Sequence, residues 1–96
     1  MTIHNHEAHK TALNFLRLAA EWRAIEADSL GEAKEIAESA FHFPEERYPH
    51  ERIEALQDAI KWLEKAERAT YLVRQYEAAA DDAMRDATAE PEDMPA

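Results

Sequence analysis

The chain has 96 residues, no cysteine and a formal net charge of −10, from 21 acidic and 11 basic side chains. The lack of cysteine excludes disulfides, thiolate metal sites and cysteine nucleophiles. The acidic balance disfavours direct binding to nucleic acid or to an anionic membrane, because phosphate contacts need a basic surface. Frequent Ala and Glu with a single Gly are typical of an all-α protein.

The N-terminal segment is rich in histidine. Residues 1–10, MTIHNHEAHK, lack the apolar core of a signal peptide, and no stretch is apolar enough to cross a bilayer, so we expect a cytoplasmic protein. His4, His6 and His9 lie close together, and a metal-binding helical bundle that uses them is one alternative function. The spacing is one residue short of HExxH. We therefore assign no metal ligand and no cofactor.

A helix is predicted from about residue 6. Its apolar side chains cover most of its circumference, which is too wide an arc for one partner helix, so we expect a homodimer. Ser29 followed by Glu32 fits a capping box, and Gly31 weakens a helix. Either a second helix starts near residues 28–31, or one helix over 6–42 is kinked there. In the second case we expect Gly31 to make room for Trp62, so that Gly31→Leu destabilises.

The only convincing loop covers residues 43–49 and contains Pro44 and Pro49, each of which disfavours helix at the residue before it. Phe41, Phe43 and Tyr48 lie around it, and they either plug the closed end of a hairpin or form an exposed contact patch.

The longest helical pattern begins at Pro49 and continues to about Ala87 without another Pro or any Gly. Its length favours a long antiparallel helical hairpin with the first helix, in a dimeric bundle. One domain is predicted over residues 1–88, followed by a disordered acidic tail over 89–96, and no internal repeat is found. The predicted apolar face of this helix contains Ile53, Leu56, Ala59, Ile60, Leu63, Ala66, Thr70 and Val73.

Two charged residues, Glu67 and Arg74, interrupt this face. Either they lie at its flank and reach water along their stems, or two copies of the helix cross antiparallel near Thr70, so that Glu67 of one copy faces Arg74 of the other. The second interpretation predicts a dimer interface made of Leu13, Leu16, Trp22, Glu67, Thr70 and Arg74.

No catalytic motif is present, because the two serines are explained by helix structure and one Gly cannot form a phosphate-binding loop. We predict no catalytic residue and no enzyme activity. The expected function is protein binding, by a small acidic inhibitor or adaptor of the phage or mobile-element type that blocks a basic partner such as a nucleic-acid-handling protein. An adaptor that binds through exposed aromatic side chains, either Trp22 and Trp62 or the aromatics around the loop, is the rival interpretation. The predicted partner-binding residues are Glu32, Glu35, Glu38, Phe43, Glu45, Glu46, Tyr48, Glu51, Glu54 and Asp58.

Overall fold

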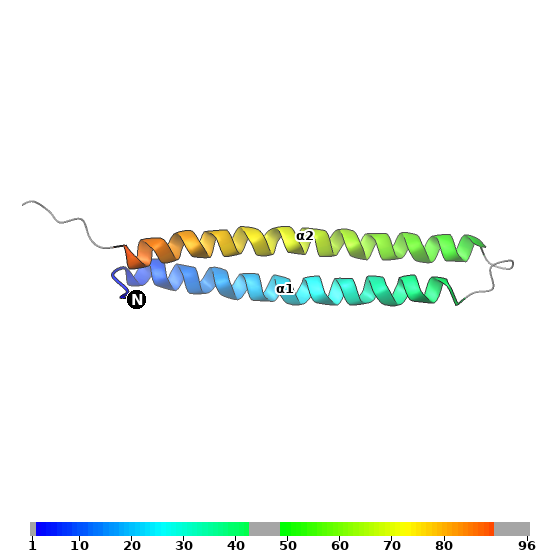
Figure 1. The fold of residues 1–96 in the computed structure, drawn as a ribbon, viewed down its shortest axis with the longest axis horizontal. Helices are drawn as coiled ribbons and strands as arrows, with labels where there is room; N and C mark the ends of the chain where they lie inside the picture. The colour runs from blue at the N-terminus through cyan, green and yellow to red at the C-terminus, as the bar shows by residue number, and fades with distance from the viewer. Residues whose placement is uncertain (1, 43–48, 90–96) are drawn as a thin grey trace, which may run out of the picture. The chain divides into compact units, whose positions relative to one another are not determined.

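The computed structural model describes residues 2–42 and 49–89, which form two helices, α1 (His6–Ala40) and α2 (Pro49–Thr88) (Figure 1). The chain divides into two compact units. We call Met1–Glu21 with Leu72–Ala96 the terminal unit, and Trp22–Tyr71 the central unit. In each unit α1 packs against α2 in the opposite direction, which confirms the prediction of an all-α antiparallel helical hairpin.

Several predicted features lie outside the described residues. These are the loop at 43–49 apart from Pro49, and the tail at 89–96 apart from Ala89. Within 2–42 and 49–89, neither helix contains a stretch apolar and long enough to cross a membrane.

The start of α1 is fixed by the side chain and backbone of Asn5. The Asn5 Oδ1 atom accepts a hydrogen bond from the Ala8 N–H at 3.1 Å, which satisfies one of the free N–H groups of the first turn. The N–H groups of His4 and Asn5 donate to the carbonyl oxygen of Ala87, at 2.7 and 3.0 Å. Within the terminal unit, the residues that precede α1 are therefore bonded to the last turns of α2.

The alternative of a helix break at residues 28–31 is wrong, because α1 continues through them without interruption. Ser29 is 1 % exposed and lies inside the helix, where it cannot act as an N-cap. The Ala- and Glu-rich sequence on both sides propagates the helix, and one Gly costs too little to stop it.

Alanine forms the seam between the helices. Ala12, Ala19, Ala33 and Ala40 of α1 follow a spacing of seven that Glu26 completes, and every one of these alanines is buried. A seven-residue repeat keeps one side of each helix turned toward the other, as in a coiled coil. The corresponding buried residues of α2 are Ala59, Ala66, Val73, Ala80 and Ala87.

The predicted apolar face of α2 is displaced from the true seam. Ile53, Ile60 and Leu63 are 56 %, 52 % and 49 % exposed, whereas Ala59 and Ala66 are buried. Small side chains at the seam let the two helix backbones approach closely, and the larger side chains then fall on the flank. The prediction placed the largest apolar side chains of α2 against the other helix. The seven-residue spacing of alanine instead determines which side of α2 is buried.

Three interhelical contacts define how the helices are aligned. In the terminal unit the rings of Phe15 and Tyr76 stack with centroids 6.1 Å apart. In the central unit the Thr70 hydroxyl donates to the carboxylate of Glu26, and the Arg52 Nε–H donates to the Ala40 carbonyl oxygen at 2.9 Å. In the central unit this alignment brings Trp62 level with Ser29, and Trp22 level with Ala69, so that each indole meets a small residue.

The role predicted for Gly31 is wrong. Gly31 is exposed, and a Cβ atom built on it meets nothing within 4 Å, so it does not make room for Trp62. Because the site is helical with no positive φ, Gly31→Ala is expected to stabilise the protein by about 1 kcal/mol through helix propensity. Thermal unfolding followed by circular dichroism measures the change. The reverse substitution at the exposed Ala24, Ala24→Gly, should destabilise by a similar amount, and a loss of stability in Gly31→Ala would contradict the assignment.

Candidate acidic binding site

The central unit has two different faces beside its seam. In heptad notation, Ala33, Ala59 and Ala66 occupy position a, and Ser29 and Trp62 occupy position d. An antiparallel pair of helices has a local two-fold axis normal to the plane of the pair, so equivalent heptad positions of both helices lie on the same side. Positions c and g therefore form one face of the central unit, and positions b and e form the other.

Carboxylates gather on the face made by positions c and g, which we call the acidic face. Five of the predicted partner-binding residues lie there, and Asp28 joins them. Glu38 lies at the outer edge of α1, at position f, and Phe43, Glu45, Glu46 and Tyr48 are outside the described residues. The acidic face contains Asp28, Glu32, Glu35, Glu51, Glu54 and Asp58.

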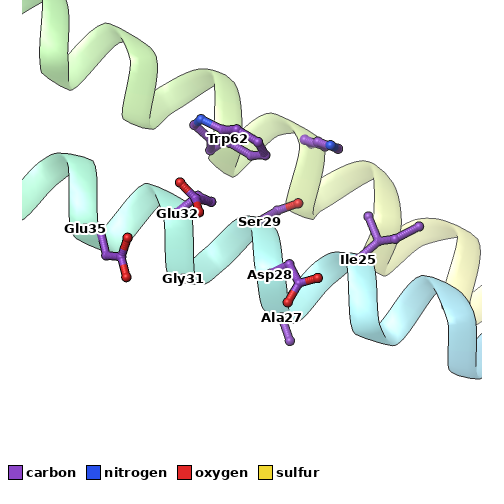
Figure 2. Close-up of a pocket in the computed structure, with 9 residues that line it drawn as sticks. Ile25, Ala27, Asp28, Ser29, Gly31, Glu32, Glu35 and Trp62 are labelled. Carbon is purple, nitrogen blue, oxygen red and sulfur yellow. The ribbon is translucent and has the colours of Figure 1, made fainter.

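A hollow of about 530 Å³ lies on the acidic face. Asp28, Glu32 and Glu35 follow one another at spacings of four and three along α1, so their carboxylates share one side of the helix. Figure 2 shows the Trp62 indole, from α2, beside Glu32 of α1, with Glu35 one turn further along. The lining consists of Ile25, Ala27, Asp28, Ser29, Gly31, Glu32, Glu35, Trp62 and Lys65.

One cation already lies at this hollow. The Lys65 Nζ atom is 4.8 Å from the centroid of the Trp62 ring, which is within the range of a cation–π contact. Lys65 is the single base among the lining residues, against three acids. A pocket with an aromatic face and an excess of carboxylates suits a guanidinium or ammonium group, which the ring and the acids attract together.

The acidic face also carries three bases at positions c and g of α2, Lys61, Lys65 and Arg68, which partly balance its six carboxylates. Lys61 Nζ lies 3.8 Å from Asp58 Oδ1, and both side chains are more than half exposed. Such exposed pairs contribute little to stability and are screened by salt. Lys61 thus partly neutralises Asp58, which does not line the hollow. The acids that line the hollow are Asp28, Glu32 and Glu35.

Sequence reasoning missed Asp28, Trp62 and Lys65 as members of one site. It interpreted Asp28 as part of a helix break and considered Trp62 only as packing for Gly31 or as an aromatic anchor. The spacing of Asp28, Glu32 and Glu35 on one uninterrupted helix was the available signal. The position of Trp62 beside them depends on the interhelical alignment.

The residues of the predicted dimer interface are divided equally between the two units. Leu13 and Leu16 are half-exposed in the terminal unit, and Arg74 is exposed there. The remaining three belong to the central unit. Trp22 and Thr70 are half-buried and Glu67 is exposed.

Exposed aromatic side chains are also present in the central unit. Phe41 is 66 % exposed, and the Arg52 guanidinium lies 5.5 Å from its ring centroid. Tyr71 is 61 % exposed. Phe41 is thus in contact with a cation of its own chain, and both tryptophans are half-buried near the seam.

The N-terminal histidines and the serines add no candidate chemistry. Across residues 2–42 and 49–89, no group of three or more His, Cys, Asp or Glu side chains is arranged to hold a metal ion. The Ser39 hydroxyl donates to the Ile36 carbonyl oxygen at 2.7 Å, as a helix serine commonly does.

No family model, curated protein or solved structure matches the chain. The fold and the acidic face are therefore the observations on which a function can be argued.

Proposed function

We propose that the chain is a cytoplasmic, non-catalytic protein-binding module that uses its acidic face to bind a basic protein partner. The observation that carries this proposal is the hollow in which Asp28, Glu32 and Glu35 of α1 lie beside the Trp62 indole. An Arg or Lys side chain of the partner would enter the hollow and replace Lys65 over the ring. The surrounding carboxylates Glu51 and Glu54 would attract the partner over a longer range.

Inhibition or adaptor function follows from the chemistry of such a partner. Proteins that handle nucleic acid carry basic surfaces for phosphate contacts, and a row of carboxylates can occupy the same surface. The module would then block the nucleic-acid site of its partner without touching nucleic acid itself. The metal-binding alternative has no supporting arrangement among the described residues. For the aromatic alternative, the well-exposed rings among the described residues of the central unit are those of Phe41 and Tyr71.

The test is titration of a fluorescent arginine-rich peptide with the full chain. Replacing Asp28, Glu32 and Glu35 by Asn, Gln and Gln is expected to weaken binding at least about tenfold, because the cation loses its nearest carboxylates. The matched control replaces Asp81, Asp82 and Asp86, which are exposed in the terminal unit, by Asn. This control also removes three negative charges, but at a different place, and is expected to change the affinity less than about twofold.

The salt dependence distinguishes the rival function. Binding by the acidic face should weaken strongly between about 0.1 M and about 1 M salt, where the screening length falls from about 10 to about 3 Å. Equal losses in both triple variants would reduce the effect to net charge and contradict the site. Binding that resists salt and is lost in Phe41→Ala would favour the aromatic adaptor.

A further inference from the structure

The second face of the central unit, made by positions b and e, is apolar and exposed. Leu30 of α1 is 46 % exposed, and Ile53, Ile60 and Leu63 of α2 are 56 %, 52 % and 49 % exposed. Leu56, at position e, is half-buried beside them. Several large aliphatic side chains that gather on one side mark a surface that another molecule covers. We call Leu30, Ile53, Leu56, Ile60 and Leu63 the aliphatic face.

The seam by itself buries little apolar surface. In the central unit the buried apolar residues are Ala33, Ala40, Ala59, Ala66 and Ala69. Each alanine contributes one methyl group, whereas the larger side chains of Leu30, Ile53, Ile60 and Leu63 remain about half in water. Helices in water depend on packing of their apolar faces for most of their stability. A stable interface covers about 800 Å² on each partner, and the aliphatic face is where this chain has apolar area to offer.

The distribution of charge indicates what covers the aliphatic face. Most carboxylates of the central unit lie elsewhere, at positions c, f and g, although the chain carries a net charge of −10. At positions b and e, α1 contributes the bases Arg23 and Lys34, and α2 contributes the acid Glu67. A basic partner would find little negative charge here. A second acidic chain, in contrast, can approach this face without strong repulsion. In each copy, the charged residues that α1 contributes to this face are positive and the one that α2 contributes is negative.

We infer that a second copy of the chain docks on the aliphatic face, so that the two hairpins form a four-helix bundle. The contact is isologous, with the same residues contributed by each copy around a two-fold axis. The aliphatic side chains of both copies form the core of the bundle. Both acidic faces remain on the outside, so the inference does not depend on the proposed function.

The test is the mass and the dissociation constant of the full chain, measured by light scattering and sedimentation over a range of concentrations. The wild type is expected to have twice the 11.0 kDa mass of the chain. Ile60→Glu is expected to weaken the dimer at least about tenfold, because two new carboxylates enter an apolar core. The matched control is Gln57→Glu, which adds the same charge at an exposed f position on the same helix and should leave the dimer unchanged.

Folding is followed in parallel, since the hairpin alone can lose helix when the dimer dissociates. A melting temperature of the wild type that rises with concentration supports the inference. A folded wild type with the mass of one chain at every concentration would overturn it and leave the aliphatic face to a different partner. A dimer that Ile60→Glu and Gln57→Glu affect equally would also overturn it, because the contact would then lie elsewhere. Arginine-peptide binding by a monomeric variant reports on the acidic face separately.

Discussion

Ala33→Leu is expected to destabilise the protein by about 1–3 kcal/mol, the usual cost of forcing extra methylene groups into a packed interior. Ala33 is 3 % exposed, and the interhelical alignment places it level with Ala59, which is 4 % exposed. A leucine at this position has no space unless the two helix backbones move apart. Separation would also disturb the neighbouring layer, in which Ser29 and Trp62 lie level with each other.

Urea unfolding of the full chain measures this loss. The control is Ala24→Leu on the same helix, where Ala24 is exposed at position f and the free energy of unfolding should change by less than about 0.5 kcal/mol. Since both variants add the same atoms, a difference between them isolates the seam. Equal stability of the two would mean that alanine is not required between the helices.

Trp62→Ala is expected to lower the free energy of unfolding by about 2–3 kcal/mol, somewhat less than the cost for a fully buried tryptophan. Trp62 is half-buried and lies level with Ser29, which is 1 % exposed. Truncation leaves a gap over Ser29 and removes the ring that Lys65 contacts at 4.8 Å. The loss combines apolar burial with a cation–π contribution.

The control for Trp62→Ala is Tyr71→Ala on the same helix. Tyr71 is 61 % exposed, so its truncation should cost less than about 0.5 kcal/mol in urea unfolding. A comparable loss in both variants would show that the stability depends on aromatic side chains in general. In that case the packing of Trp62 on Ser29 would not be the cause.

The hairpin could be predicted from sequence because its signals are local. Pro44 and Pro49 mark the turn, and the long stretches without Gly or Pro favour helices on both sides. Ser29 and Gly31 misled the prediction, since a capping pattern also occurs within a helix whose flanking residues propagate it strongly.

The packing surfaces were harder to predict. Large residues such as Ile60 and Leu63 suggested the buried side, whereas the closest approach belongs to the alanines one position away. A shift of one residue rotates a helix by about 100°, which is enough to exchange seam and flank. The acidic site depends on this rotation and on the interhelical alignment, neither of which is a local property. Individual carboxylates could therefore be identified, but their grouping around Trp62 could not.

The alanine repeat has a consequence for how the two helices find each other. A seam of nearly identical side chains at intervals of seven is almost unchanged when one helix slides by one heptad, so alanine alone permits several alignments of similar energy. Within the central unit the tryptophans remove this ambiguity. A slide in one direction would place Trp22 level with Trp62, and a slide in the other would place Trp62 level with Ile36, in a gap sized for alanine or serine. The two indoles thus permit a single register of the helices. The alanines bring the helices so close together that an indole in a wrong register would clash.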